Sequence, residues 1–389
     1  MFEGLGQPSG AARKRILCCD GGGVRAMITL RCLQALEKQL GVSCYDYFDM
    51  FAGTSGGAEV IALLALGRSV DEVIAILRDR RPEMFARTAL SFLHPLTTKY
   101  RKESIHRLFM DIYGADRRLR ELERDVLITA VDTVRSETIF FTSFRLPNGG
   151  RHGTYRDVRV RDAVEASAAA PTFYQAHGRF IDGGIGAYNN PAYVAAVEAL
   201  RYSSDREREP SAYDGAELEV YSFGTGLQLH TMAPGEAMKK CSLGWLRYML
   251  QEGPDQANWQ QSYVAQSELD IAEHAVTFYR YDLYLTDAVI QEAVPGTTWG
   301  PSDLAIDAGD DERFGLLDRI GSFYAAYLAK NGFFIDPHRA TPVIAPSHAA
   351  AVRLGRTSTR WDEYGKPPLP ADYVAQVLAQ FDEVDSRFD

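Results

Sequence analysis

A serine flanked by glycines is the residue of this 389-residue sequence best suited to nucleophilic chemistry. The stretch Gly53-Thr54-Ser55-Gly56-Gly57 matches the pattern G-x-S-x-G, which places a serine on a sharp turn between a strand and a helix. Small residues are required around it because larger side chains would collide with neighbouring backbone. An apolar strand precedes the motif and an apolar helix follows it, so we expect Ser55 to be a nucleophile. A glycine turn with only a structural role is the alternative.

A glycine-rich loop, Asp20-Gly21-Gly22-Gly23-Val24-Arg25, also joins a predicted strand to a predicted helix. The backbone N–H groups of Gly21, Gly22 and Gly23 can converge on one point, and the following helix adds its positive end. Such a loop can hold a phosphate or the oxyanion of an acyl-transfer transition state, although a tight turn without a ligand is equally compatible with it. No G-x-G-x-x-G or Gly-Lys-Ser/Thr pattern completes a nucleotide site. Because parallel strands end at one sheet edge, we expect this loop and Ser55 to meet there.

Asp182 is the residue that we expect to take the proton from the serine. It ends a predicted strand, and the two glycines after it let another chain segment approach closely. A carboxylate accepts a serine proton best when burial raises its pKa toward the working pH. A plain Asp-Gly turn is the alternative at this position. None of the histidines stands in a supporting local pattern; they are His94, His106, His152, His177, His230, His274, His338 and His348.

Alternating strands and helices must position these groups. A strand–turn–helix pattern occurs twice, over 15–40 and 47–66, which predicts a parallel sheet covered by helices. Residues 78–125 show no strand pattern and carry 12 Arg and Lys against 8 Asp and Glu, so we expect a basic helical insertion over the sheet edge. The periodicity weakens after 230, and a Pro-containing stretch, 337–370, precedes a short final helix. Further strands are predicted at 126–131, 138–144, 178–181, 217–223 and 278–284, and further helices at 160–169 and 313–328.

Length and composition favour one large α/β domain. We expect a flexible leader over 1–14, a catalytic domain over 15–335 that includes the helical cap insertion 78–125, and a C-terminal extension over 336–389 packed on the same domain. A hydrophobic fraction of 46% and a charged fraction of 24% exclude a disordered or coiled-coil chain. The net charge of −10 argues against a nucleic-acid partner.

Cysteine usage and hydropathy indicate a cytoplasmic protein that meets membranes only at their surface. The five cysteines include no C-x-x-C pair, which predicts reduced thiols and neither a disulfide framework nor a zinc site. The first residues lack the basic and apolar regions of a secretory signal. The longest apolar run, Val60 to Leu66, is too short to cross a bilayer. The basic stretch 78–125 offers positive charge to an anionic bilayer, although a solvated helical face explains it equally well.

Taken together, the motifs resemble those of the patatin-like phospholipase family. The glycine loop and the serine motif are followed, in the family's order, by Ala166-Ser167-Ala168-Ala169-Ala170-Pro171-Thr172-Phe173 and Asp182-Gly183-Gly184. Two later stretches, Asn189-Asn190-Pro191 and Ser222-Phe223-Gly224-Thr225-Gly226, resemble further family motifs, so the resemblance covers residues 15–226. The family commonly has glycine after the arginine of the first motif, where this chain has Ala26. One extra methyl group is tolerated in the first turn of a helix.

The resemblance implies a three-layer α/β/α hydrolase with a mainly parallel central sheet. It implies a lipid acyl hydrolase of the phospholipase A type, which uses a Ser55–Asp182 dyad and an acyl-enzyme to cleave fatty-acyl esters of membrane phospholipids. Gly21, Gly22 and Gly23 would form the oxyanion hole on this basis. Arg25 would steady their loop or contact an anionic head group. No metal or other cofactor is implied, and no calcium-loop pattern occurs in the sequence.

Three other expectations stay open at the level of sequence. A Ser-His-Asp α/β-hydrolase would need a histidine after Asp182, and the candidates are His230, His274, His338 and His348. A non-catalytic module would keep the glycine loop to bind a phosphate-bearing ligand. Bacterial patatin-like proteins also include effectors that cyclic nucleotides switch on in anti-phage defence. The helical insertion and the C-terminal third would then supply a cyclic nucleotide pocket or the contact of a homo-oligomer.

Overall fold

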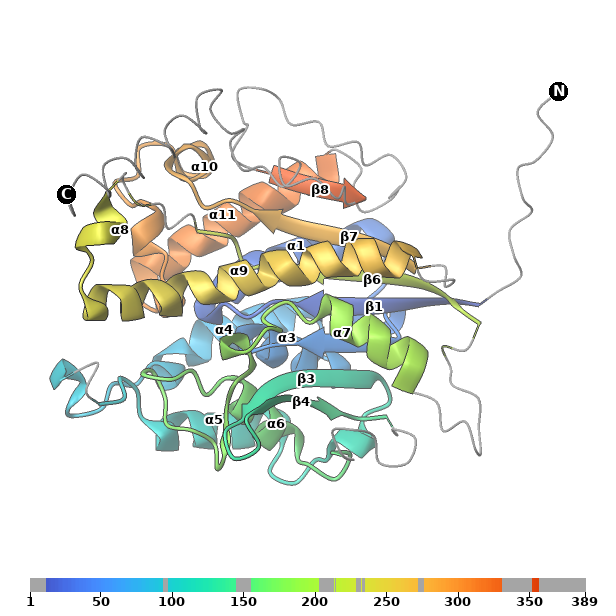
Figure 1. Ribbon diagram of the computed structural model, residues 1–389. Helices are drawn as coiled ribbons and strands as arrows, with labels where there is room; N and C mark the ends of the chain where they lie inside the picture. The colour runs from blue at the N-terminus through green and yellow to red at the C-terminus, as the bar shows by residue number, and fades with distance from the viewer. Residues whose placement is uncertain are drawn as a thin grey trace, which may run out of the picture.

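A single β-sheet runs through the middle of the chain. The computed structural model describes residues 12–93, 97–144, 155–202, 213, 215–228, 232, 235–271, 276–330 and 352–356. Within these residues eight strands share the sheet (Figure 1). They are β1 (Arg13–Cys19), β2 (Met50–Gly53), β3 (Asp125–Asp132), β4 (Glu137–Thr142), β5 (Phe180–Asp182), β6 (Glu217–Phe223), β7 (Val276–Leu283) and β8 (Val352–Arg356).

The central strands are parallel, and this places the loops that follow them at one edge. The strand order is β4-β3-β2-β1-β6-β7-β8, and the four pairs between β3 and β7 are all parallel. Cys19, at the end of β1, is level with Gly53 at the end of β2 and with Phe223 at the end of β6. The segments that leave these three strands therefore start side by side. Strands β4 and β8 pair antiparallel at the two ends of the sheet, and β5 pairs antiparallel with β3.

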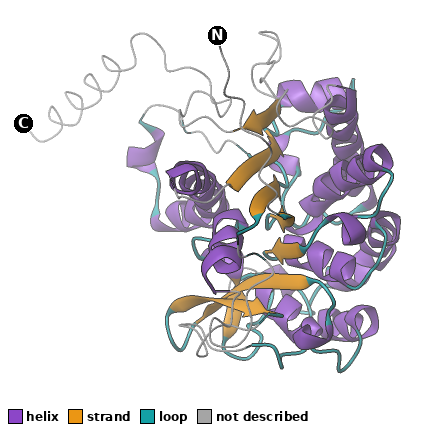
Figure 2. Cartoon of the chain, turned by 90° about the vertical axis from the view of Figure 1, so that its right-hand side faces the viewer, coloured by secondary structure: helices purple, strands orange, loops and turns teal. Residues whose placement is uncertain are grey.

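Helices cover both faces of the sheet (Figure 2). The α-helices are α1 (Ala26–Leu40), α2 (Cys44–Tyr47), α3 (Gly56–Ala65), α4 (Val70–Met84), α5 (Lys102–Tyr113), α6 (Val160–Ser167), α7 (Ala192–Val197), α8 (Glu236–Lys239), α9 (Ser242–Ile271), α10 (Asp287–Ala293) and α11 (Asp311–Lys330). The shorter helical segments are η1 (Gly23–Arg25), η2 (Ser91–Leu93), η3 (Leu119–Glu121), η5 (Gly183–Ile185), η6 (Glu198–Tyr202) and η7 (Pro301–Asp303). On one face α7 packs on β1 and β6, and α9 packs on β7. On the other face α3 and α6 pack on the strands, α1 packs against α3, α4 and α11, and α5 packs against α4 and α6. The predicted three-layer fold with a mainly parallel sheet is confirmed.

The residues of β1 face two separate hydrophobic cores. Leu17 and Cys19 belong to the larger core, which includes α1 and α3, whereas Ile16 and Cys18 belong to the core beneath α7. All four side chains are fully buried. A parallel strand that is covered on both faces requires an unbroken apolar run, and the sequence of β1 supplies one.

Several element boundaries differ from the predictions. Tyr47 ends the short helix α2 instead of starting a strand, because Ser43 caps that helix by accepting a hydrogen bond from Asp46 N–H at 3.1 Å. The boundary predicted at residue 78 falls inside α4. The region after 230, which was predicted to be less regular, contains the 30-residue helix α9. Pro254 lies inside α9, and because proline disfavours a helix interior the sequence pattern concealed this helix.

Some predicted features lie partly or wholly outside the described residues. The leader predicted over 1–14 is described from residue 12, and Arg13 and Lys14 already belong to β1. The predicted final helix lies outside the described residues, and the described part of 336–389 is β8, which pairs with β7. All five cysteines are free thiols, as predicted. Among the helices that the structure describes, none combines the length and apolarity that crossing a bilayer requires.

Candidate active site

Ser55 occupies a strained turn between β2 and α3. Its φ of 52° and ψ of −125° lie in a region that residues other than glycine rarely adopt. Gly57 N–H donates to Thr54 O at 2.8 Å and closes the turn. A Cβ atom on Gly57 would overlap the backbone oxygens of Cys19 and Asp20, so this position requires glycine. The motif therefore forms the sharp strand-to-helix turn that its sequence predicts.

The hydroxyl of Ser55 is hydrogen-bonded to Asp182. Ser55 Oγ donates to Asp182 Oδ2 over 2.6 Å. The other carboxylate oxygen, Oδ1, accepts a hydrogen bond from Gly184 N–H at 2.7 Å. Asp182 ends β5, whose antiparallel pairing places it opposite Ala130 of β3. The fold thus brings together two residues that are 127 positions apart in the sequence.

Burial determines the protonation behaviour of the Asp182 carboxyl. Only 5% of the residue is exposed. Burial raises the pKa of Asp182 to about 6, and the hydrogen bonds from Ser55 and Gly184 oppose that rise. The group is therefore mostly ionised at pH 7, yet it is a stronger base than a carboxylate in water. Its contact with Ser55 lies within the distance that proton transfer requires.

The loop after β1 is anchored through Gly21. The N–H group of Gly21 donates to Asn189 O at 3.1 Å, and its carbonyl oxygen accepts from Thr225 Oγ1 at 3.0 Å. The N–H groups of Gly22 and Gly23, in contrast, have no acceptor among the described residues. Of the three glycines predicted to bind an oxyanion, Gly22 and Gly23 thus have available donors, whereas the amide of Gly21 is already used.

A buried ion-pair network holds Asp20 at the start of this loop. Arg280 on β7 donates from Nη1 to Asp20 Oδ1 at 2.8 Å and from Nη2 to Asp20 Oδ2 at 2.5 Å. The same guanidinium group donates to Asp282 Oδ2 at 2.7 Å and to Ser222 Oγ at 2.8 Å. Burial raises the pKa of Asp20, while Arg280 and, more weakly, Arg25 lower it. No local sequence pattern points to Arg280 and Asp282, because they reach the loop only through the pairing of β1, β6 and β7.

Arg25 adds positive charge to the same loop. It ends η1, directly before α1, and only 6% of it is exposed. Its Nε and Nη1 atoms have no hydrogen-bond partner among the described residues. Arg25 therefore carries two donors that a further anionic group can use.

Two hydroxyl groups hold the turn around Ser55. Ser55 N–H donates to Ser167 Oγ, at the end of α6, over 2.8 Å. Thr54 Oγ1 lies 2.6 Å from Thr129 Oγ1 and donates to Tyr188 O at 2.7 Å. Ser167 and Thr54 stand within the motifs on which the family resemblance rests, which is the signal that points to them. Their roles depend on contacts between distant segments, which the sequence alone does not show.

The described histidines form a cluster of their own. His106 Nδ1 lies 2.6 Å from Glu165 Oε2, and His177 Nδ1 lies 3.0 Å from Glu165 Oε1. One ligand-type atom from each residue lies within 4.8 Å of the others, a spacing that suits a metal ion. However, Arg161 Nη1 faces His106 Nε2 at 3.1 Å. A metal on Nδ1 would place the ring proton of His106 on Nε2, against that donor, so the cluster fits hydrogen bonding better than metal binding.

The histidines that a Ser-His-Asp triad would need are not in the described part of the chain. His230, His274, His338 and His348 all lie outside it. Among the described residues, the Asp182 carboxylate bonds to the hydroxyl of Ser55 and to the N–H group of Gly184. The geometry of the described residues therefore pairs the serine with a carboxylate.

Comparisons with known proteins identify related sequences. Residues 17–196 match the family model described as patatin-like phospholipase, and they include Ser55, Asp182 and the glycine loop. The cGAMP-activated phospholipase of Escherichia coli (strain TW11681) is 27% identical over 356 residues, which are 84% of this chain and 94% of that protein. The cUMP-AMP-activated phospholipase of Escherichia coli is 31% identical over 198 residues, 48% of this chain and 58% of that protein. The 85/88 kDa calcium-independent phospholipase A2 of Mus musculus is 28% identical over 227 residues, 54% of this chain and 27% of that protein.

Proposed function

Because residues 17–196 belong to the patatin-like phospholipase family, we propose that this protein is a serine hydrolase that cleaves fatty-acyl esters of membrane phospholipids, as a phospholipase A. The observation that carries the proposal is the 2.6 Å hydrogen bond from Ser55 Oγ to Asp182 Oδ2. The N–H groups of Gly22 and Gly23, on the neighbouring loop, are available as donors. A nucleophile, a base and oxyanion donors are the parts that acyl transfer requires. The relatives named as phospholipases support this substrate class.

The first half-reaction transfers the acyl group to the enzyme. Ser55 Oγ attacks the carbonyl carbon of the ester while its proton passes to Asp182 Oδ2. The carbonyl oxygen becomes an oxyanion that the N–H groups of Gly22 and Gly23 stabilise. The bond between the carbonyl carbon and the alcohol oxygen then breaks. Asp182 returns the proton to that oxygen, and a lysophospholipid leaves.

The second half-reaction releases the fatty acid. Water attacks the carbonyl carbon of the acyl-enzyme and gives a proton to Asp182, and the same two N–H groups stabilise the new oxyanion. The bond between the carbonyl carbon and Ser55 Oγ breaks, and the proton passes from Asp182 to that oxygen. The free enzyme is regenerated. Arg25 lies beside this path, and its charge steadies the loop. Its Nε and Nη1 atoms are buried, so they do not reach an anionic head group without a rearrangement of the loop.

Peripheral contact with a membrane is proposed at the end of the molecule that carries the dyad. Phe92 of η2 is 76% exposed, and Leu243, Leu246 and Met249 are exposed along the first turns of α9. Figure 1 shows η2 and the start of α9 on the left, the side toward which β1 runs. Exposed apolar groups of this size favour contact with lipid. The excess of basic residues in 78–125 adds attraction to anionic lipids.

Activation by a cyclic nucleotide is the regulation that we propose. Its support is that two relatives are named for activation by cGAMP and by cUMP-AMP, and that the first of them matches 84% of this chain. Activation of this kind would make the protein an effector of bacterial antiviral defence. Phospholipid turnover should therefore rise when cGAMP or cUMP-AMP is added to the purified protein. Full turnover without nucleotide, unchanged by either compound, would contradict this part of the proposal.

Product analysis by mass spectrometry tests the proposed activity. Mixed phospholipids are incubated with the wild-type protein, with and without the two cyclic nucleotides, and with the variants Ser55→Ala and Asp182→Asn. We expect free fatty acid and lysophospholipid from the wild type and a loss of at least about a thousandfold in each variant. The exposed residues Ser322 and Asp116 provide matched controls, because Ser322→Ala and Asp116→Asn should keep wild-type rates.

Each opposing outcome of that experiment has a defined meaning. Wild-type rates in Ser55→Ala or Asp182→Asn would exclude the dyad. Loss of activity on replacing His230, His274, His338 or His348 by alanine would favour the triad mechanism instead. Absence of products from the wild type under every condition would favour a non-catalytic module that binds a phosphate-bearing ligand.

A further inference from the structure

Gly21 and Gly22 share one peptide unit, whose carbonyl oxygen belongs to Gly21 and whose N–H group belongs to Gly22. Because a trans peptide unit is planar, these two groups point in opposite directions. The N–H group of Gly22 has no acceptor among the described residues. The loop also lies against the nucleophile, since a Cβ atom on Gly21 would be 3.3 Å from Ser55 Cβ. Any group that holds Gly21 O therefore also sets the direction of the Gly22 N–H group beside Ser55.

Two side chains donate hydrogen bonds to Gly21 O. Thr225, in the segment after β6, donates from Oγ1 at 3.0 Å. Asn189, in the segment before α7, donates from Nδ2 over a longer distance of 3.4 Å. Both residues are buried, with 3% of Thr225 and 5% of Asn189 exposed. Thr225 lies so close to the loop that a Cβ atom on Gly22 would be 2.1 Å from its Oγ1 atom. The Gly22 N–H group thus points away from Thr225.

The peptide groups on both sides of Thr225 are fixed in turn. Thr29 on α1 donates from Oγ1 to Gly224 O at 2.8 Å. The N–H group of Gly226 donates to Asp282 Oδ1 at 3.0 Å. The hydroxyl of Thr225 is therefore presented to Gly21 by a segment that is bonded to α1 and β7.

The helix α9 supports Asn189 with a buried polar face. Asn258 Oδ1 accepts a hydrogen bond from Asn189 Nδ2 at 2.9 Å. Only 4% of Asn258 is exposed, and Asp255, Gln261 and Ser262 of the same helix are buried as well. Burying polar side chains is less favourable than burying apolar ones, so this face of α9 indicates a role beyond packing. Its contact with Asn189 connects α9 to the glycine loop.

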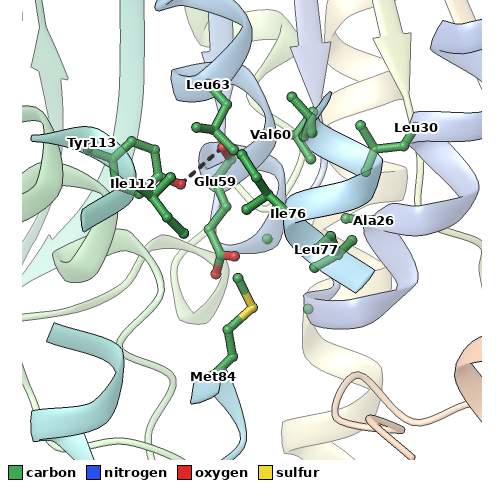
Figure 3. A pocket seen from close by; sticks show the side chains of 13 residues that line it. Ala26, Leu30, Glu59, Val60, Leu63, Ile76, Leu77, Met84, Ile112 and Tyr113 are labelled. Carbon is green, nitrogen blue, oxygen red and sulfur yellow. Dashed lines mark hydrogen bonds between the residues drawn. The ribbon is translucent and has the colours of Figure 1, made fainter. Parts of the chain in front are cut away.

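Packing closes another side of the loop. Gly23 lies directly against Gly56, because a Cβ atom on Gly56 would be 2.7 Å from Gly23 O and 2.9 Å from Gly23 N. The cavity behind these two glycines has a free volume of about 20 Å³, which holds about one water molecule. Side chains of α1, α3, α4 and α5 close around it (Figure 3). The loop therefore has no room to retreat on this side, and rotation of its peptide units is the freedom that the side-chain hydrogen bonds must control.

We propose that Thr225, together with Asn258 acting through Asn189, positions the Gly22 N–H group for the oxyanion of the reaction. The inference rests on the proposed function, because it starts from an ester whose carbonyl carbon lies at Ser55 Oγ. Without these supports the Gly21–Gly22 peptide unit would rotate and turn its N–H group away from the oxyanion. The hydrogen bond between Ser55 and Asp182 involves neither support, so the nucleophile would stay intact while the transition state lost a donor.

Replacing the carbonyl oxygen of the substrate by sulfur tests this inference. Sulfur is a weak hydrogen-bond acceptor, so a thionoester gains little from the Gly22 N–H group, whereas the oxygen ester depends on it. The kcat values are measured with p-nitrophenyl butanoate and with O-p-nitrophenyl thiobutanoate, at enzyme concentrations high enough to detect the slower thionoester. In Thr225→Val, which removes the hydroxyl and keeps the shape, we expect the ratio of oxygen ester to thionoester rates to fall at least about tenfold.

Three further variants complete the test. Thr225→Ser keeps the hydroxyl and should restore most of the wild-type ratio. Asn258→Ala should lower the ratio about threefold to tenfold, a smaller effect because Asn258 acts through Asn189. Thr142→Val is the matched control: Thr142 of β4 is also fully buried and donates to a backbone oxygen, that of Phe144, at 3.4 Å. Its two rates should both stay at the wild-type level.

The outcomes distinguish this inference from the function on which it rests. An equal loss of both rates in Thr225→Val, with the fold intact by circular dichroism, would show a general structural effect and overturn the role of Thr225. Should Thr225→Val not fold, the ratio in Asn258→Ala decides in its place. An unchanged ratio in Asn258→Ala would overturn the role of α9. Hydrolysis of neither ester by the wild type, with or without cyclic nucleotide, would contradict the proposed function itself and the inference with it.

Discussion

Asp182 gains its basicity from its surroundings. A carboxylate in water, with a pKa near 4, is too weak a base to accept a proton from serine readily. Burial raises the pKa of Asp182 to about 6, while the hydrogen bonds from Ser55 and Gly184 keep the group ionised at neutral pH. In the proposed mechanism, the strained backbone of Ser55 would hold the hydroxyl in position before substrate arrives, so that little further ordering would be needed for the reaction.

The rate of hydrolysis should follow the ionisation of Asp182. With a butanoyl ester we expect kcat/KM to be constant above about pH 7 and to fall about tenfold per pH unit below the pKa of Asp182, because the protonated carboxyl cannot accept a proton. The measurement is the initial rate at low substrate concentration across this range. An inflection well above pH 7, or a rate that does not fall toward acidic pH, would contradict the assignment of Asp182 as the base.

At the residue level, local motifs limited what the sequence could predict. Ser55 stands in a G-x-S-x-G motif and two glycines follow Asp182, each at the end of a predicted strand, and this context points to both residues. Arg280 has no such local signal. Arg280 reaches Asp20 through the register of three strands, β1, β6 and β7.

The position of the dyad depends on how closely α3 approaches β1. The two strands that end at Cys19 and Gly53 stop at the same level, so the loop after β1 and the turn after β2 lie against each other. Gly57, in the first turn of α3, contacts the backbone of Cys19 and Asp20 with no room for a side chain. The glycines of the serine motif are thus needed for the packing of two elements as well as for the turn itself.

A matched pair of glycine substitutions tests this packing. Gly57→Ala should lower the free energy of unfolding by about 1–3 kcal/mol, because its methyl group forces α3 away from β1. Gly315→Ala, on the helix α11, meets no atom within 4 Å and should raise the free energy of unfolding by about 0.5–1 kcal/mol. Urea unfolding at equilibrium measures both. Equal stability of the two variants would show that α3 does not approach β1 as described.

Element by element, the sequence predicted the parallel core better than the later helices. The two strand–turn–helix units that begin with β1 and β2 have unbroken apolar runs, and glycines mark the ends of their helices. The structure contains both units. The helix α9 was missed because Gly253 and Pro254 interrupt a segment with little apolar periodicity. Packing against α7 and β7 supplies the stability that its own sequence does not show.

At the scale of the whole molecule, the dyad and the exposed apolar residues lie toward the same end. The parallel strands run toward this end, and the site lies where they stop. The first turns of α9, which carry the exposed Leu243 and Leu246, lie at this end in Figure 1. Phe92 of η2 is exposed as well. A protein with a net charge of −10 would be repelled by an anionic bilayer in most orientations. Local apolar contacts and the basic residues of 78–125 would select the orientation that presents the site to lipid.

Vesicle binding tests this orientation. The double variant Leu243→Ser/Leu246→Ser should bind vesicles that contain anionic phospholipid about tenfold more weakly than the wild type, because two apolar contacts with the bilayer are lost. Val42→Ser is the matched control: Val42 is also exposed, but it follows α1, which runs away from this end. Vesicle co-sedimentation measures both variants. Equal loss of binding in both, or in neither, would contradict the proposed membrane-facing surface.

Covalent labelling by an alkyl fluorophosphonate is the most direct test of the central claim, that Ser55 is a nucleophile activated by Asp182. The account predicts one adduct per chain, located on the peptide that contains Ser55 by mass spectrometry, absent in Ser55→Ala and formed at least about a hundredfold more slowly in Asp182→Asn. No adduct on the folded wild-type protein, an adduct on another residue, or undiminished labelling of Asp182→Asn would contradict it.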